Sequence, residues 1–165
     1  MSDATPPPDR SVGPGVLIPP PLLFVFPMAM GFVVQYIVPI GIVTGARPAH
    51  TLRLVGWAEI LIGLALNAWA VGTFNRLETT VIPRRPARTL AAEGPYKLTR
   101  NPMYLGFAII YLGVAFVANA FWVLLFLPEA IVLVWLLAIK LEEAYLRREF
   151  GAAYDEYRSR VRRWI

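Results

Sequence analysis

The stretch MYLGFAIIYLGVAFVANAFWVLLFLPEAIVLVWLLAI, residues 103–139, decides the fold of this chain. Asn119 and Glu129 are its only strongly polar residues. A helix needs about 20 apolar residues to cross a bilayer. The run is therefore too long for one span and suits two, which turn near residues 118–120. Pro128 predicts that the second of these spans is broken or bent.

Two further apolar runs precede this stretch, and the first contains Pro27 and Pro39, which predict kinks. The predicted spans are 21–43, 52–74, 103–118 and 121–139. Residues 1–20 are rich in Pro and Gly, have no periodicity and lack the pattern of a signal peptide, so we expect a disordered tail. The sequence thus predicts an all-α, polytopic membrane bundle of four transmembrane helices, with residues 21–165 as one domain.

The composition is typical of a membrane protein, and it limits the kinds of catalytic or metal-binding site that the chain can contain. Hydrophobic residues make up 57% of the chain and charged residues 16%, against about a quarter charged in soluble domains. The absence of Cys excludes disulfides, thiolate metal sites and Cys nucleophiles. His50 is the only histidine and no serine lies near it in sequence, so neither a multi-His metal site nor a Ser-His triad is expected. Any catalytic or binding site must therefore be formed by carboxylates, Arg, Tyr, Asn, backbone groups or a cofactor.

The positive charges indicate an orientation in the membrane. Net charge is +5, but the basic residues flank the apolar runs, so topology explains them better than nucleic-acid binding does. One lies in the tail, six in 76–101 and seven from Lys140 onward, whereas the opposite side holds only Arg47 and Arg53. Both termini and the segments 76–104 and 140–165 are therefore predicted to be cytosolic. The expected location is the plasma (inner) membrane.

The C-terminal segment is predicted to be amphipathic helix interrupted or capped at Gly151. On sequence alone, two interpretations of Glu142 and Glu143 stay open: a solvated helix face, with Glu143 pairing with Arg147 at i+4, or a carboxylate that binds a cofactor through hydrogen bonds or charge. The end of the segment is expected to lie at the membrane surface. There Trp164 would anchor at the headgroups, and lipid phosphates would be contacted by Arg160, Arg162 and Arg163.

Three polar residues lie within the predicted spans, namely Glu59, Asn67 and Glu129. Intramembrane polar groups usually face a bundle interior or a cavity. Two interpretations remain open: Glu59 and Glu129 line the distal end of a lipid pocket, or they form hydrogen bonds that hold helices together.

The loop before residue 103 carries strong local signals. Gly94-Pro95 is a turn signal, and Asn101-Pro102 predicts a helix that starts at Pro102. The N–H groups at such a helix start can receive a carboxylate. Asn101 could equally be a simple N-cap, and Tyr96 and Tyr104 could be ordinary interfacial aromatics.

Several motifs then follow in a fixed order. They are Gly94 with Tyr96; Arg100, Asn101, Pro102 and Tyr104; Glu142, Glu143 and Leu146; and Phe150, Gly151, Tyr154 and Tyr157. In order and spacing they resemble the isoprenylcysteine carboxyl methyltransferase and phospholipid methyltransferase superfamily of integral-membrane enzymes. The resemblance implies S-adenosylmethionine as methyl donor and a lipophilic acceptor, prenyl- or lipid-like, that enters from the bilayer. The implied partners are this acceptor and membrane lipids, without nucleic acid or metal.

The resemblance also implies site residues. It gives Arg100 and Glu142 positioning roles in catalysis, and it assigns the cofactor pocket to Arg88, Thr89, Leu90, Ala91, Tyr96, Asn101, Pro102, Met103, Tyr104 and Glu142. Two positions depart from the prenylcysteine enzymes: Asn101 stands where they have His, and Ala138 where they have a substrate-contacting Arg. Asn cannot titrate, and the missing Arg argues against a prenylcysteine carboxylate as acceptor.

Two rival hypotheses explain part of the sequence. A membrane NADPH-dependent reductase would share a similar C-terminal architecture. A small membrane scaffold or transporter subunit would explain the hydropathy but not the register of the motifs.

Overall fold

The computed structural model describes residues 14–77 and 89–164, and within them every regular element is helical. This confirms the predicted all-α fold. The elements are α1 (Pro20–Ile37), α2 (Ala46–Arg76), a 3-10 turn (Gly94–Lys97), α3 (Pro102–Val117), α4 (Phe121–Leu125), α5 (Leu127–Val134), a π-helical turn (Trp135–Ile139), α6 (Lys140–Phe150) and α7 (Ala152–Arg160).

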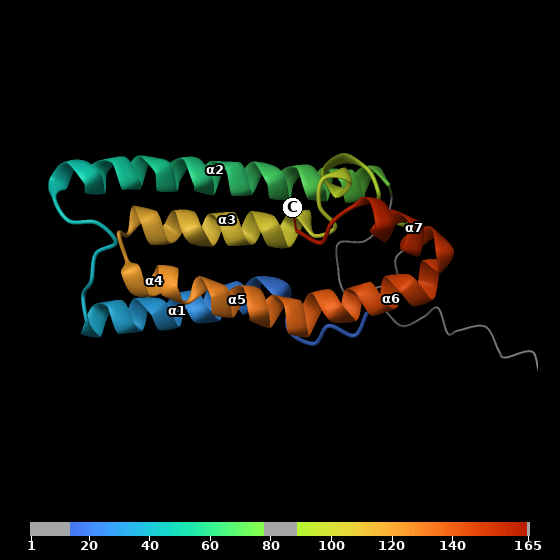
Figure 1. Cartoon of the computed structure of the whole chain (residues 1–165), viewed down its shortest axis with the longest axis horizontal. Helices are drawn as coiled ribbons and strands as arrows, with labels where there is room; N and C mark the ends of the chain where they lie inside the picture. The colour runs from blue at the N-terminus through green and yellow to red at the C-terminus, as the bar shows by residue number, and fades with distance from the viewer. Residues whose placement is uncertain (1–13, 78–88, 165) are drawn as a thin grey trace, which may run out of the picture.

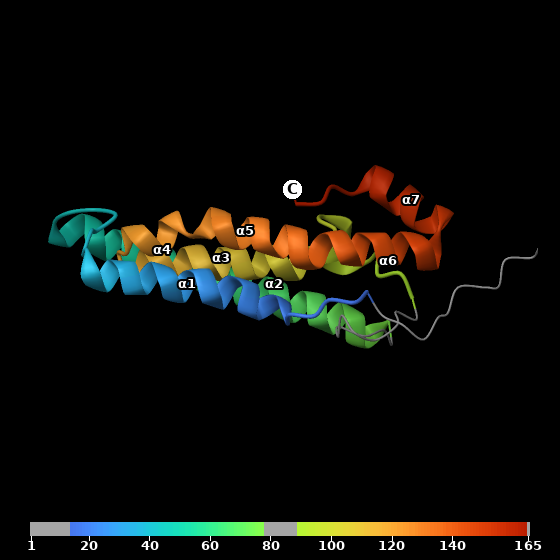
Figure 2. The same ribbon diagram turned by 90° about the horizontal axis from the view of Figure 1, so that it is seen from below.

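Helix α2 packs along α3, and α3 and α1 pack along a long rod made of α4, α5 and α6 (Figures 1 and 2). Within residues 14–77 and 89–164, three helices are long and apolar enough to cross a membrane: α1, α2 and the rod over Phe121–Phe150. The fourth apolar helix, α3, has 16 residues and is about 24 Å long. It is shorter than the hydrocarbon layer of about 30 Å, so the count of four full spans stays a prediction.

The first helix is shorter than the predicted span. It ends at Ile37, so Pro27 lies inside it, whereas Pro39 lies beyond its end and kinks nothing. The physical reason is local: a residue before proline is driven out of the helical region, and Val38 has φ −128° and ψ 85°. The last predicted span is interrupted at Phe126, which confirms the break expected near Pro128.

The segment before α1 differs from the predicted tail where the structure describes it. Val16 is 2% exposed and belongs to the same apolar cluster as Leu23 and Phe24. Burying an apolar side chain stabilises this docking by the hydrophobic effect. Val16 therefore docks onto the bundle, and the helix begins at Pro20, inside the predicted tail.

Small residues allow α2 and α3 to approach closely. A methyl group added at Gly56 or at Gly63 would lie 2.6 Å from the carbonyl oxygens of Gly113 and Gly106, respectively. Only a residue without a side chain fits such a contact, as is common between membrane helices. This contact fixes α2 against α3, the two helices that carry one wall of the site described below.

The end of the bundle at residues 38–45 is tied to the α3–α4 turn by Asn119. This residue has φ 49°, and its side chain accepts a hydrogen bond from the Val43 N–H at 3.0 Å and donates one to the Val43 carbonyl at 3.0 Å. The turn predicted at 118–120 is thereby confirmed. All chemistry-bearing motifs lie at the opposite end of the bundle.

The orientation of the bundle in the membrane can be tested with single cysteines, since the chain has none. We predict that Ala118→Cys, exposed beside the Asn119 turn, reacts with an impermeant maleimide added outside intact cells. Ala92→Cys should react only after permeabilisation, because the basic segments hold its end in the cytosol. Labelling of Ala92→Cys from outside would contradict the orientation.

Candidate functional site

A cavity of about 550 Å³ lies at the end of the bundle opposite Asn119, where the N-terminal segment, α2, the 89–101 loop, α3, α6 and α7 meet. Nearly all the site residues predicted from the sequence line it: Thr89, Leu90, Ala91, Tyr96, Arg100, Asn101, Met103, Tyr104 and Glu142. Pro102 is buried at the start of α3 and does not line the cavity. Arg88 lies outside the described residues.

The loop that carries Tyr96 is fixed by its turn and by α7. Gly94 has φ +55°, and a side chain there would lie 2.6 Å from the Thr73 hydroxyl, so glycine is required. Tyr96 is buried and packs edge-on against Phe74, with ring centroids 5.1 Å apart. The Tyr157 hydroxyl donates a 2.8 Å hydrogen bond to the Tyr96 carbonyl. Tyr96 is thus part of the cavity wall, and not an interfacial aromatic.

The C-terminal residues dock onto the same loop through backbone hydrogen bonds. The Arg100 N–H donates to the Arg162 carbonyl at 2.9 Å, and the Thr99 hydroxyl donates to the Arg163 carbonyl at 2.9 Å. The Asn101 side-chain amide donates to that same Arg163 carbonyl at 3.0 Å. Asn101 therefore occupies the N-cap position of α3 without capping it, and the simple N-cap interpretation is wrong.

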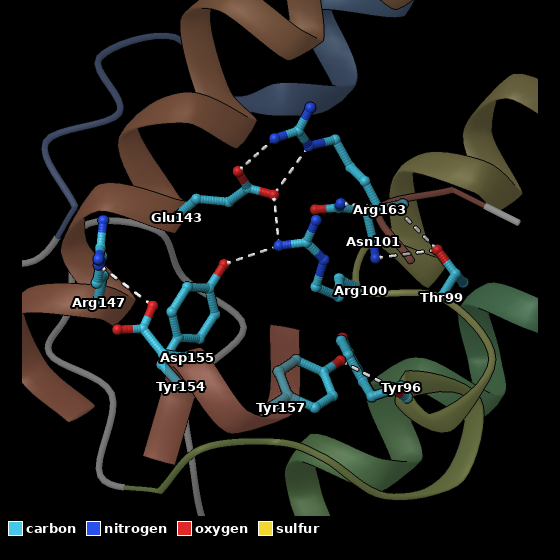
Figure 3. A network of polar contacts seen from close by, with 10 residues as sticks. All are labelled: Tyr96, Thr99, Arg100, Asn101, Glu143, Arg147, Tyr154, Asp155, Tyr157 and Arg163. Carbon is cyan, nitrogen blue, oxygen red and sulfur yellow. Dashed lines mark hydrogen bonds and ion pairs between the residues drawn. The ribbon is translucent and has the colours of Figure 1, made fainter. Parts of the chain in front are cut away.

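A charged network joins the loop to α6 and to the C-terminus (Figure 3). One guanidinium nitrogen of Arg100 lies 3.1 Å from Glu143 Oε1 and 3.4 Å from the Tyr154 hydroxyl. Arg163 donates two hydrogen bonds to the Glu143 carboxylate, at 2.9 and 2.7 Å. The side chains of Arg100, Glu143 and Arg163 are 10%, 17% and 33% exposed. Two cations thus share one largely buried carboxylate.

This network overturns two expectations for the C-terminal segment. Glu143 does not pair with Arg147, which instead lies 3.2 Å from Asp155. Arg163 binds Glu143 and is not available to a lipid phosphate. The reason is common to both: α7 folds back after Gly151 and brings the C-terminus onto the loop (Figure 2). Trp164 is partly buried and packs against the apolar core, and its predicted anchoring at the headgroups stays a prediction.

Glu142 is the carboxylate that faces the cavity. Its Oε1 accepts a 2.6 Å hydrogen bond from the hydroxyl of Tyr104, which is itself buried and not interfacial. Burial raises the pKa of Glu142; the hydrogen bond from Tyr104 opposes the rise, and the negative charge of Glu143 adds to it. No cation pairs with Glu142 within the described residues. A cationic ligand in the cavity would therefore meet an uncompensated carboxylate.

Charge and burial shift other groups of the site as well. Burial raises the pKa of the Tyr96 hydroxyl, and the nearby Glu142 raises it further. Burial likewise raises the pKa of Tyr154, with Arg100 opposing the rise. A neutral phenol keeps its hydroxyl proton, so Tyr96 and Tyr154 can each donate a hydrogen bond to a ligand. The Arg100 Nε is buried without a hydrogen-bond partner among the described residues.

Several cavity residues were not assigned to the site from the sequence. Glu143, Leu146, Tyr154 and Tyr157 belong to the motifs, so their place in the pattern was a usable signal. Tyr145 lies between motif residues in the C-terminal segment. The others are apolar residues that the sequence assigns to spans or to the tail, and their pattern shows no site: Pro14, Val16, Pro19, Pro20, Pro21, Val71, Phe74 and Phe107. Conversely, Glu59, Asn67 and Glu129 do not line the cavity. Buried oxygens of Glu59 and Asn67 lack a hydrogen-bond partner in the described part of the chain.

Comparison with known proteins identifies relatives. The sequence model of the phospholipid methyltransferase family matches residues 52–153. The chain is also 32% identical, over 135 residues, to "Protein-S-isoprenylcysteine O-methyltransferase B" of Arabidopsis thaliana, an alignment that covers 78% of this chain and 66% of that protein. The chain thus spans about two thirds of the length of this relative. No solved structure matches.

Proposed function

Because this chain belongs to the phospholipid methyltransferase family, we propose that it is an integral-membrane methyltransferase that transfers a methyl group from S-adenosylmethionine to a lipophilic acceptor. One observation supports this most strongly: a single cavity at one end of the bundle joins the motif residues from the 89–104 region and α6. A membrane scaffold would have no need of such a cavity.

The side chains of the cavity fit the proposed donor. The Glu142 carboxylate can accept hydrogen bonds from ribose hydroxyls or an adenine amine, or lie near a sulfonium charge. No side chain caps α3, so the N–H groups of its first turn, at Met103 and Tyr104, can receive a carboxylate, which the positive end of the helix dipole favours. When bound, S-adenosylmethionine would supply a methyl group to an electron pair of the acceptor atom, and the electron pair of the broken carbon–sulfur bond would remain on the sulfur.

The apolar part of the cavity fits the acceptor. Val71 and Phe74 from α2 and Phe107 from α3 form a wall that a lipid chain can contact without crossing water. The polar groups at the other side would hold the reacting head. Catalysis would then consist mainly of positioning, with the acceptor atom about 3–3.5 Å from the methyl carbon.

The acceptor is proposed to differ from a farnesylcysteine carboxylate. Ala138 is fully buried in the π-helical turn and brings no cation to the site. Arg100 is then the cation that would orient the cofactor or an anionic acceptor, and its buried Nε has no partner within the described residues. Asn101 cannot exchange a proton, so no step of the proposal uses it as a base.

A binding measurement tests the proposed cofactor. Purified protein in detergent should bind S-adenosylmethionine in calorimetric titrations, and Glu142→Ala should weaken binding by about 1–3 kcal/mol because it removes a buried hydrogen-bond acceptor. Glu156→Ala is the matched control, since Glu156 is exposed, pairs with Arg160 at 3.2 Å and does not line the cavity. Saturable NADPH binding without a response to S-adenosylmethionine would favour the reductase, and binding of neither cofactor would favour a scaffold.

A pH series tests the role of the Glu142 charge. Because its pKa is raised, Glu142 loses its charge as the pH falls through that raised value. We therefore expect S-adenosylmethionine to bind more tightly as the pH rises, because the ionised carboxylate attracts the sulfonium. S-adenosylhomocysteine shares the other ionisable groups but has a neutral sulfur, so its affinity should change less. Glu142→Gln should remove the difference between the two ligands; a difference that persists would assign the effect to Glu143, Tyr104 or Tyr96.

A further inference from the structure

A second concave site lies on the outer side of the network, between α6 and α7. We call it the α6–α7 groove. It has a volume of about 470 Å³, and its lining consists of Lys140, Glu143, Ala144, Arg147, Arg148, Tyr154 and Arg158. Four of these residues are cations, and none of the four lines the cavity of the proposed methyltransferase site.

The acidic groups near the groove are already paired. Both oxygens of Glu143 are bound, one to Arg100 and Arg163 and the other to Arg163 alone. Asp155 lies 3.2 Å from Arg147 and compensates that guanidinium. Neither of these two carboxylates therefore forms an ion pair with the other three cations of the groove.

Those three cations make no ion pair within the described part of the chain. The Lys140 ammonium lies 4.3 Å above the Trp135 ring, and the Arg148 guanidinium lies 5.7 Å from the Tyr145 ring. Cation–π contacts orient a positive charge but do not cancel it. Arg158, on α7, is exposed. The groove thus presents a concentrated positive potential, which favours an anion.

The groove begins where the apolar part of the long rod ends. Lys140 directly follows the apolar residues 121–139, and α7 folds back beside α6 after Gly151 (Figures 1 and 2). One turn before Lys140, Leu136 and Leu137 are 42% and 40% exposed. Residues three and four apart share a helix face, so an apolar surface continues from the groove toward the bilayer.

From this arrangement we propose that the α6–α7 groove binds the phosphate of an anionic phospholipid. Lys140 and Arg158 contact the headgroup, and Leu136 and Leu137 contact the acyl chains. A free phosphate would contact only the cations of the groove, whereas a lipid would contact the cations and the apolar surface of Leu136 and Leu137. Basic pockets beside membrane helices are suited to anionic headgroups. The lipid is not the methyl acceptor, because the groove and the cavity are lined by different cations and share only Glu143 and Tyr154.

Thermal unfolding of the purified full chain in neutral detergent tests the proposal. Phosphatidylglycerol should raise the midpoint by several degrees, because a ligand that binds only the folded state stabilises it. Phosphatidylcholine with the same acyl chains, and sodium phosphate at equal concentration, should each give a much smaller shift. The double substitution Lys140→Gln and Arg158→Gln should abolish the response that is specific to phosphatidylglycerol.

Arg160→Gln is the matched control for Arg158→Gln, because each removes one positive charge from α7 but Arg160 pairs with Glu156 outside the groove. This variant should keep the response. If Arg160→Gln reduces the phosphatidylglycerol response as much as the double substitution does, the net charge of the protein and not the groove explains the rise in the unfolding midpoint. An equal effect of sodium phosphate would identify a free-anion site, and an equal effect of phosphatidylcholine would identify acyl contacts alone; either result overturns the proposal. Should the double variant not fold, Arg158→Gln alone provides the same comparison.

Discussion

Glu143→Gln is expected to destabilise the protein by about 3 kcal/mol, because removing one partner of a buried ion pair leaves the others uncompensated. Arg100 and Arg163 both depend on this carboxylate, and Arg100 is 10% exposed. The substitution keeps the shape of the side chain and removes only its charge. Reversible unfolding in detergent, followed by tryptophan fluorescence, measures the change.

Glu156→Gln provides the comparison for that measurement. Glu156 also pairs with an arginine, Arg160, at 3.2 Å, but both side chains are largely exposed. An exposed pair of this kind contributes roughly 0–1 kcal/mol. Glu143→Gln should also impair methyl transfer, since Arg100 lines the cavity, whereas Glu156→Gln should leave it unchanged. Equal destabilisation by both substitutions would mean that the Arg100–Glu143–Arg163 network does not hold the site together.

Gly63→Ala is expected to destabilise the protein by about 1–3 kcal/mol through overpacking. The added methyl group would lie 2.6 Å from the Gly106 carbonyl oxygen and 2.6 Å from a side-chain carbon of Ile110. Backbone cannot move aside as a flexible side chain can, so α2 and α3 must separate. Unfolding measurements in detergent would give the loss of stability.

The same separation should lower methyl transfer, because α2 and α3 both contribute to the cavity wall, through Phe74 and Phe107. Gly72→Ala is the matched control on α2, since nothing lies within 4 Å of the added methyl group. Alanine is the better helix former by about 1 kcal/mol, so Gly72→Ala should be neutral or slightly stabilising. If Gly63→Ala behaves as Gly72→Ala does, the close approach of α2 and α3 is not required.

The sequence by itself determined the helical class, the apolar segments and the breaks between them. These features depend on residues that lie near one another along the chain. The apolar run 103–139 is too long for one span, Asn101-Pro102 starts a helix, and Gly151 ends one. Proline removes an N–H and restricts its predecessor, and glycine permits positive φ, wherever they occur. Such signals predict element boundaries without knowledge of the fold.

The register of the motifs also predicted most of the residues that meet in the cavity, but it did not predict their partners. Local spacing predicted that Glu143 pairs with Arg147 and that the Asn101 side chain caps the helix that follows it. In the folded chain Glu143 binds Arg100 and Arg163, and Asn101 donates to the Arg163 carbonyl. Helical periodicity describes only neighbours three or four residues apart.

Only the tertiary structure decided which groups compensate each other's charge and which apolar residues form the cavity wall. Val16 and Phe107 read as tail and membrane span in the sequence, yet both line the cavity. α7 folds back after Gly151 and brings Arg163 to Glu143, 20 residues away along the chain. Buried charges and hydrogen-bonding groups must find partners wherever the packed helices place them. Their pairing is therefore set by the packing of the whole bundle and cannot be obtained from local sequence.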